Sequence, residues 1–550
     1  MENTSFDVLI VGGGPCGLML ALELGRRGVH TLLVNEQPDT AFNPQANATQ
    51  ARTMEHFRRL GFADEVRALG LPPDFPTDIA YCTRYAGHEL ARFRLPSAKD
   101  AKKAAAAGTG SWSAAELPHR VSQKFVEKLL REKVGALPSV TLRYGWRLTQ
   151  FEDNGAHVAA TIAPAEGGPP VQVQANYLVG ADGPRSFVRQ TMGWSLTGES
   201  GVQRDFMGGR MYAMYIKAPT FYDVSAHPPA WMNVTFNRDR RAFMAAVDGV
   251  ESFAFHTQLK PHEREDAISE SDAKAMFCEA VGRDMPLEIL SRRTWTAGHC
   301  LVANQFQKGR VFIAGDAAHL FTPTGGLGYN TAVEDAVNLG WKLAAVLGGY
   351  AAPRLLTSYE RERQPAAIRN TGYARGFADS LGLFSPVAEI EDESPAGAKA
   401  REEAGAYLAA HGRAEFNIPG VTFGTRYDGS PAIVPDGTTP PQDAANTYEP
   451  SATPGGRAPH YWLAAGQSLY DAFGFDWTLL HFGLDAHDVS EWRIAAEQRG
   501  LPLQVCHVAD ADIRAGYGCD WALIRPDQVV AARGSSAAEP RRYMQALLGS

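Results

Sequence analysis

The sequence lacks several features that would each have narrowed its class. No run reaches the roughly 18 apolar residues that a membrane helix needs. The six cysteines include no Cys-x-x-Cys and no zinc-like pairing, which argues against a disulfide scaffold and a bound metal. The first residues carry no positive segment before the short apolar run 6–11, so we expect no signal peptide and a cytoplasmic location.

An excess of basic residues is also missing. The chain has 53 Lys and Arg against 61 Asp and Glu, which gives a formal charge of −8. It therefore has no excess of positive charge that would attract nucleic acid. Apolar residues make up 45% of the chain, enough for a large core and against general disorder. At roughly 150 residues per domain, 550 residues predict three or four structural units.

A glycine-rich turn near the start predicts dinucleotide binding. Residues Gly12 to Gly17 read Gly-Gly-Gly-Pro-Cys-Gly, a G-x-G-x-x-G between a predicted strand at 6–11 and a predicted helix at 18–25. Such glycines permit a tight turn, a close backbone approach to pyrophosphate and close packing of helix on strand. Glu36 follows a second predicted strand at 29–34, where a carboxylate can accept hydrogen bonds from ribose hydroxyls. The alternative, an ordinary glycine turn, is less compatible with both strands and Glu36.

Two further predicted strands end in a glycine and an acid. Residues 177–186 contain Asp182-Gly183, and residues 311–319 contain Gly315-Asp316, followed by a glycine loop at 323–330. A long helix should follow that loop, since apolar residues recur on one face at helical spacing. Each piece alone is compatible with a simple turn or a loop before a helix.

Taken in order, these motifs resemble the group A flavoprotein monooxygenases, the family of p-hydroxybenzoate hydroxylase and phenol hydroxylase. The resemblance covers about residues 5–375. It implies an α/β fold with a Rossmann-like FAD-binding domain from residues 1–200 and 291–380 and an inserted β-rich substrate domain at 201–290. A helical segment and linker at 381–455 would precede a thioredoxin-like α/β domain at 456–550.

The resemblance also implies which residues bind FAD. In the family a cationic residue often stands where this chain has Gln45, so Arg52 is our candidate for that contact to the diphosphate. Gln123 matches a glutamine that contacts the flavin side chain, and Asp182 belongs to a motif linked with both FAD and the nicotinamide nucleotide. The other implied positions are Gly12, Gly13, Gly14, Pro15 and Gly17 for the pyrophosphate, Glu36 and Gln37 for the ribose, Gly315 and Asp316 for the ribityl chain, and Gly326, Gly328, Tyr329 and Asn330 for the isoalloxazine.

The reaction implied is hydroxylation of a phenolic or other electron-rich aromatic substrate. NADH or NADPH would reduce FAD, and O2 would react through a flavin C4a-hydroperoxide. Tyr215 and His256 are candidate bases that could accept a phenol proton. Arg210 could pair with an anionic group of the substrate, and the loop that starts at Pro323 would border the reacting face of the flavin. For Tyr215, His256 and Arg210 a packed or solvated structural residue is the stronger alternative.

Two competing functions are considered. The flavin halogenases share the fold but carry a W-x-W segment that this sequence lacks. A non-catalytic flavin-binding or sensor protein would use the C-terminal domain as a partner-binding module. That domain is expected to be structural or to support a homodimer, since Cys506 and Cys519 lie thirteen positions apart and lack a redox motif.

Overall fold

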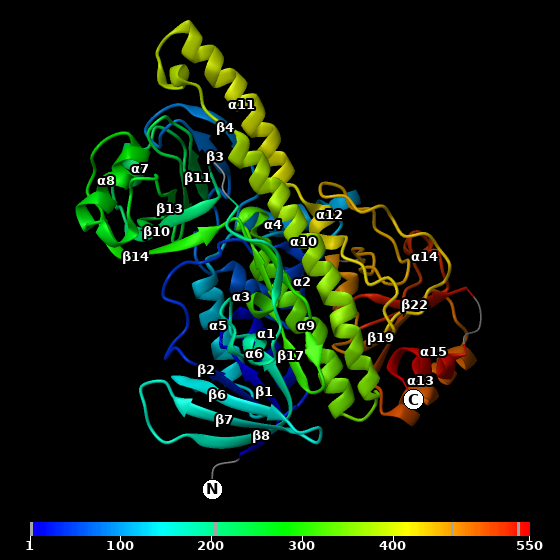
Figure 1. Cartoon of the computed structure of the whole chain (residues 1–550). Coiled ribbons are helices and arrows are strands. Elements are labelled where there is room, and N and C mark those ends of the chain that lie inside the picture. The colour runs from blue at the N-terminus through cyan, green and yellow to red at the C-terminus, as the bar shows by residue number, and fades with distance from the viewer. Residues whose placement is uncertain (1–3, 203–205, 464–465, 536–538, 550) are drawn as a thin grey trace.

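The computed structural model describes residues 4–202, 206–463, 466–535 and 539–549. Figure 1 shows three lobes, with the C-terminal lobe at the right. Among these residues no helix is both long and apolar enough to cross a membrane. The same residues contain no group of three or more His, Cys, Asp and Glu side chains arranged to hold a metal ion.

The first lobe is built on an eight-stranded sheet whose main path runs β16-β17-β8-β1-β2-β5. Strands β17, β8, β1, β2 and β5 are parallel, and β6 and β7 extend the sheet beside β8. The strands are β1 (Ser5–Val11), β2 (Thr31–Asn35), β5 (Val140–Tyr144), β6 (Trp146–Asp153), β7 (Val158–Pro164), β8 (Val171–Gly180), β16 (Gln307–Lys308) and β17 (Val311–Ile313).

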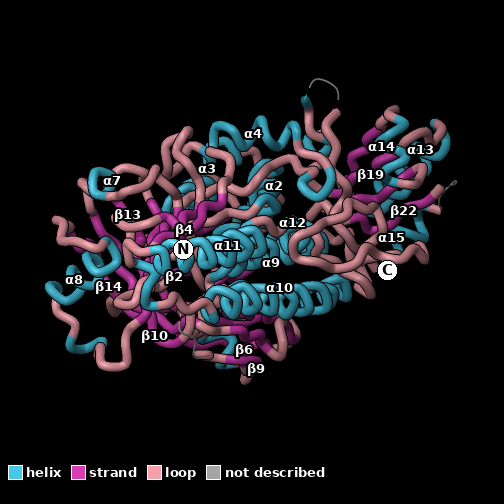
Figure 2. The backbone as a smooth tube through the Cα atoms, turned by 90° about the horizontal axis from the view of Figure 1, so that it is seen from above, coloured by secondary structure: helices cyan, strands magenta, loops and turns pink. Residues whose placement is uncertain are grey.

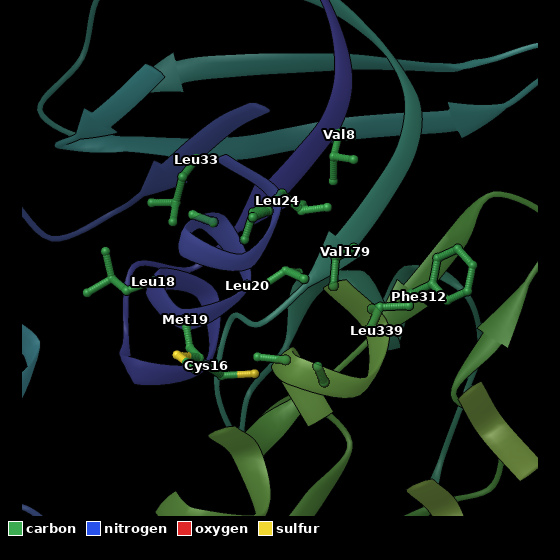
Figure 3. Packing of buried hydrophobic residues seen from close by; sticks show 14 of the residues in the cluster. Val8, Cys16, Leu18, Met19, Leu20, Leu24, Leu33, Val179, Phe312 and Leu339 are labelled. Carbon is green, nitrogen blue, oxygen red and sulfur yellow. The ribbon is translucent and has the colours of Figure 1, made fainter. Parts of the chain in front are cut away.

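Buried helices pack against this sheet. Helix α1 (Pro15–Gly25) is buried along nearly its whole length, and α9 (Leu327–Leu347) packs beside it. Figure 3 shows Leu20 of α1, Val179 of β8 and Leu339 of α9 in one apolar cluster. The predicted strand–turn–helix–strand unit at the start of the chain is therefore present. The other helices here are α2 (Ala51–Arg59), α3 (Ala63–Arg67), α4 (Ala98–Ala107), α5 (Gln123–Gly135) and α6 (Phe187–Thr191).

The second lobe is a seven-stranded sheet in the order β14-β10-β13-β12-β11-β3-β4. It draws on more of the chain than the predicted 201–290, because β3 and β4 come from residues 79–93 and β14 runs on to Ala297. Helices α7 (Phe221–Val224) and α8 (Glu270–Val281) belong to this lobe. The strands are β3 (Ile79–Cys82), β4 (Glu89–Phe93), β10 (Gly209–Lys217), β11 (Met232–Thr235), β12 (Ala242–Ala246), β13 (Ser252–Gln258) and β14 (Glu288–Ala297).

Two long helices connect the lobes. Figure 2 shows α10 (Thr357–Leu383) and α11 (Pro395–Phe416) lying side by side across the molecule. Helix α11 is less exposed than its sequence suggested, since Leu408 and His411 are buried. A small sheet in the order β18-β15-β9 lies beside α10, formed by β9 (Leu196–Glu199), β15 (Cys300–Ala303) and β18 (His319–Phe321).

The C-terminal lobe follows α12 (Pro419–Phe423) and a mostly irregular stretch at 424–463. Its four-stranded sheet has the order β20-β19-β21-β22, with β19 parallel to β20 and antiparallel to β21. The elements are β19 (Trp477–His481), α13 (Ala486–Arg499), β20 (Leu503–His507), α14 (Ala511–Tyr517), β21 (Trp521–Ile524), β22 (Val530–Gly534) and α15 (Pro540–Leu548).

Candidate active site

The glycine-rich turn between β1 and α1 is sterically restricted to glycine at two positions. Gly12 has φ of +112°, and a Cβ there would lie 2.1 Å from the carbonyl oxygen of Ala181. A Cβ on Gly17 would lie 1.9 Å from the carbonyl oxygen of Gly12. These contacts are closer than any side chain tolerates, so the turn packs directly against the end of β8 and against its own helix.

Gly14 differs from its neighbours because it faces open space. It is the N-cap residue of α1, and a Cβ added to it would meet no atom within 4 Å. The first N–H groups of a helix lack intrahelical partners and carry partial positive charge, which favours an anion. Pro15, at the start of the helix, has no N–H to satisfy. The turn is held from behind by Asn35 Oδ1, which accepts from Gly13 N–H at 2.9 Å. The cradle therefore fits a diphosphate.

Asp316 lies beside this cradle. Gly315 packs so closely against α1 and α9 that a Cβ there would lie 3.1 Å from the Cβ of Cys16 and 3.3 Å from that of Ala332. Asp316 itself is open to solvent, yet the surrounding protein raises the pKa of its carboxyl. Because solvent reaches this carboxylate, it can accept hydrogen bonds from the hydroxyls of a sugar-like chain.

A buried ionic network that the motifs did not predict supports the Gly315 turn. Asp335 of α9 accepts hydrogen bonds from the backbone N–H of Gly315 at 3.0 Å, from Nε2 of His319 at 2.6 Å and from Nε of Arg363 at 2.7 Å. Burial favours the neutral form of Asp335, but the charges of His319 and Arg363 outweigh it and lower its pKa. No motif in the sequence marked Asp335, whose neighbours on the same helix face include the polar Asn338 and Lys342.

The glycine loop before α9 is tied to the segment at 46–50. Asn330 accepts the N–H of Gln50 at 2.8 Å and donates to the carbonyl of Ala48 at 2.9 Å. Gly326 has φ of +65°, and a Cβ there would lie 3.0 Å from the Cβ of Ala48. Pro323 is exposed at the start of this turn, Gly328 is half-buried and Tyr329 is buried. The side chain of Asn330 thus shapes the loop, which leaves backbone groups for a ligand.

Three predicted side chains are engaged within the protein. The Gln123 amide donates to Glu127 at 2.6 Å. Asp182 accepts from the hydroxyl of Ser186 at 2.5 Å and from a backbone N–H, so its carboxylate stabilises the start of α6. Arg52 bonds Glu55 at 2.9 Å and, across the lobe boundary, Gln528 at 2.6 Å. Glu36 and Gln37 are exposed immediately after β2.

The second sheet brings two of the predicted substrate residues to one face. Ala213 of β10 pairs with His256 of β13, and Tyr215 lies two residues further along β10, so Tyr215 and His256 share that face. Tyr215 meets the first lobe, because Nζ of Lys124 in α5 lies 3.4 Å from its hydroxyl. Lys124 directly follows Gln123, so this face adjoins the predicted flavin contact.

Arg210 does not join them. It pairs with Thr296 on β14 and lies on the face opposite to Tyr215, since five residues separate the two along one strand. Its guanidinium bonds the hydroxyls of Thr294 and Thr296 and forms an ion pair with Glu265. Arg210 therefore has protein partners on the far side of the sheet.

His256 is buried in an aromatic setting that keeps it neutral. It stacks on Phe243 with 4.5 Å between ring centroids, and its Nδ1 accepts from the indole N–H of Trp295 at 3.2 Å. Burial, with a smaller contribution from the charge of Arg293, lowers its pKa to about 3. Because indole only donates, the proton of the neutral ring is on Nε2. The ring of His256 can therefore donate from Nε2 and is a poor base.

Comparison with known proteins agrees with this geometry. Residues 5–373 match the family model for an FAD binding domain, and residues 451–550 match that for the C-terminal region of aromatic-ring hydroxylases. The chain is 30% identical to a 2,4-dichlorophenol 6-monooxygenase from Cupriavidus pinatubonensis, over 96% of this chain and 93% of that protein.

Two solved structures extend the likeness over the whole chain. The rebeccamycin biosynthetic enzyme RebC with reduced flavin has a TM-score of 0.87 and 33% identity and is covered completely by the match. A ternary complex of aklavinone-11 hydroxylase with FAD and aklavinone has a TM-score of 0.83 and 26% identity, again over both whole chains. The likeness supports FAD as the cofactor of this chain.

Proposed function

Because the chain belongs to the family of FAD-dependent aromatic-ring hydroxylases, we propose that its aromatic substrate lies on the sheet face of Tyr215 and His256. The enzyme is an FAD-dependent monooxygenase that hydroxylates an aromatic compound, with NADH or NADPH as reductant. The observation that carries the placement is the contact of Lys124 with Tyr215, which joins this face to the first turn of α5. Bound FAD supplies the activation of O2 and the oxygen transfer.

The chain's own residues would then divide the work as follows. The N-terminus of α1 and Asp316 hold the diphosphate and ribityl parts of FAD, and Glu36 and Gln37 the adenosine ribose. The backbone of the 326–330 turn would contact the isoalloxazine, and Pro323 would border that part of the site. Asp182 and Arg52 act through the turns and lobe contacts that their hydrogen bonds stabilise.

Tyr215 is our candidate for moving the phenol proton. Its oxygen accepts from the Lys124 ammonium, which also lies 4.6 Å from the centre of the Tyr215 ring. That arrangement leaves the Tyr215 O–H free to hydrogen-bond a substrate oxygen. His256, neutral with its proton on Nε2, would orient the substrate by donating to it.

The C-terminal lobe is proposed to be thioredoxin-like and without redox activity. Its βαβ unit followed by an antiparallel strand pair supports that likeness. Burial raises the pKa of the Cys506 thiol and raises that of Cys519 to about 12, so neither forms a reactive thiolate at neutral pH. A homodimer and a cytoplasmic location are further proposals, to be checked by light scattering and cell fractionation.

The test is turnover by the FAD-loaded protein with a panel of phenols, hydroxybenzoates and aromatic polyketides. We expect reduced nicotinamide to be consumed faster with a substrate, and one atom of labelled O2 to appear in the product by mass spectrometry. Lys124→Met and Tyr215→Phe should each lower the product formed per nicotinamide oxidised while FAD occupancy stays at the parent level. Unchanged coupling in both variants would refute the placement of the substrate beside Tyr215.

A further inference from the structure

The glycine loop before α9 is held by a buried side chain that none of the sequence motifs singled out. The carboxylate of Glu415, near the end of α11, accepts the backbone N–H of Gly325 at 2.9 Å. The carbonyl of the same glycine accepts from the side-chain amide of Gln50 at 2.8 Å. Both backbone polar groups of Gly325 are therefore bonded to side chains from distant segments of the chain.

The backbone at this point needs such constraints. Gly325 has φ of +67°, and Gly326 after it also has a positive φ. Two consecutive glycines can adopt many conformations, so they do not by themselves fix the direction of the chain that follows. The ring of Phe377 in α10 packs close by, because a Cβ on Gly325 would lie 3.2 Å from it. The hydrogen bond to Glu415 therefore helps to select one conformation of the loop.

The Glu415 carboxylate is itself oriented by its own helix. His411 lies one turn earlier on α11, and both side chains are buried. Nε2 of His411 lies 2.8 Å from Oε2 of Glu415, and its Nδ1 lies 3.1 Å from the hydroxyl of Ser380 in α10. These contacts join α10, α11 and the loop in one line of polar groups that ends at the N–H of Gly325.

The charge of Glu415 is more than this hydrogen bond requires. Burying a carboxylate is costly, and a glutamine would offer an acceptor oxygen in the same place without a charge. That charge also reaches the second lobe. Burial lowers the pKa of Arg120 to about 10, and Glu415 opposes that shift. Burial, with a smaller contribution from Glu415, raises the pKa of Tyr81, which lies in one cross-strand row with His256. The carboxylate thus lies close to both the glycine loop and the proposed substrate face.

We propose that Glu415 is a positioning residue for FAD, which fixes the glycine loop and makes reduction of the isoalloxazine less favourable. This inference rests on the proposed contact between the 326–330 turn and the isoalloxazine. Reduction adds negative charge to the flavin, and a fixed carboxylate in a buried setting opposes such charge. The N-terminus of α9, which has no side-chain cap, has the opposite effect. Glu415 would therefore limit how readily the nicotinamide reduces FAD, through its charge and through the loop.

The experiment compares Glu415→Gln and Glu415→Met in the full-length protein without an aromatic substrate. Glutamine keeps an oxygen that can accept the N–H of Gly325 and removes only the charge. We expect its FAD dissociation constant to stay within about twofold of the parent value, while the midpoint potential of the bound flavin, measured against redox dyes, rises. Methionine also removes the acceptor, and we expect FAD to bind at least fivefold more weakly. Glu402→Gln, exposed on the same helix, is the matched control and should equal the parent in both quantities.

A parent-like midpoint potential in Glu415→Gln would overturn the inference, as would an equal rise in Glu402→Gln. A folded Glu415→Met that binds FAD as tightly as the parent would also overturn it. If the melting temperature shows that Glu415→Met does not fold, the potential of Glu415→Gln decides alone. Because neither quantity involves an aromatic substrate, the expected shifts without any hydroxylated product would support this inference and contradict the proposed function.

Discussion

His319 and Asp335 form a fully buried pair, with 2.6 Å between Nε2 and Oδ2, directly behind the turn that presents Asp316. The same carboxylate oxygen accepts the N–H of Gly315. The position of Asp316 therefore depends on the side chain of Asp335, which lies twenty residues after Gly315. This dependence leads to the first prediction.

Asp335→Asn should destabilise the protein and weaken FAD binding together. The substitution leaves His319 without its carboxylate and Arg363 with Glu334 as its remaining acid, and breaking a buried ionic group in this way costs about 3–5 kcal/mol. Glu403→Gln, on the exposed face of α11, is the control and should change stability by less than about 0.5 kcal/mol. Urea unfolding and FAD occupancy measure both effects. Parent-like values for Asp335→Asn would show that the network does not support the turn.

Gly14→Ala should separate cofactor binding from folding. The backbone of Gly14 is one that alanine adopts, and the added methyl meets no protein atom, so the apoprotein should be as stable as the parent. The methyl would project where the diphosphate approaches, and we expect at least a tenfold loss of FAD affinity. Gly372→Ala, also facing open space but in α10, should leave affinity unchanged. Equal FAD affinity in Gly14→Ala and the parent would show that the diphosphate does not bind at this turn.

Gly326→Val should impair the loop before α9. The positive φ disfavours valine, and even the first added carbon would press on Ala48, which belongs to the segment bonded by Asn330. We expect lower FAD occupancy or less product per nicotinamide oxidised, because oxygen transfer needs close alignment of the ring. Comparing both quantities in variant and parent tests this, and no change in either would place the loop away from the flavin.

Stability should fall as the pH drops from 7.5 to 5.5. His119, His256 and His460 have pKa values near 3 in the folded protein, chiefly because of burial, against 6.5 when unfolded. Below pH 6.5 the unfolded chain binds protons that the folded chain does not, so each histidine costs about 1.4 kcal/mol at pH 5.5. In urea unfolding at both pH values, His256→Gln should reduce the loss by about that amount. The exposed His262→Gln should not, and equal pH dependence in all three proteins would contradict the burial argument.

Replacing Cys506 and Cys519 by serine should leave turnover within about twofold of the parent. Both thiols are buried in the C-terminal lobe with raised pKa values, and the proposed reaction does not involve them. Product formation by the folded, FAD-loaded double variant is the measurement. A large loss there would point to a redox role for this lobe.

Local patterns predicted much of the fold, because short strands, glycine turns and helix faces are encoded by neighbouring residues. The strand–turn–helix at Gly12–Gly17 and the strands later found as β8 and β17 are of this kind. Pairing between distant segments was not predictable: β3 joins β11 across some 150 residues of chain, and this enlarges the second sheet. The opposite orientation of Arg210 and Tyr215 could have been predicted from their odd spacing along one strand.

The hydroxyl of Tyr427, in the irregular stretch after α12, accepts from Arg363 at 2.9 Å, and Arg525 of the C-terminal lobe donates to Glu362 at 2.8 Å through each of two nitrogens. Arg363 and Glu362 are consecutive in α10 and both are buried. A protein cut after residue 373 would therefore lose both of these contacts, while Arg363 would keep its ion pair with Asp335 and Glu362 its ion pair with Lys342. Buried polar contacts thus join the two parts that the family models match separately. Exchanging either part with that of a relative would have to preserve both residue pairs, Arg363 with Tyr427 and Glu362 with Arg525.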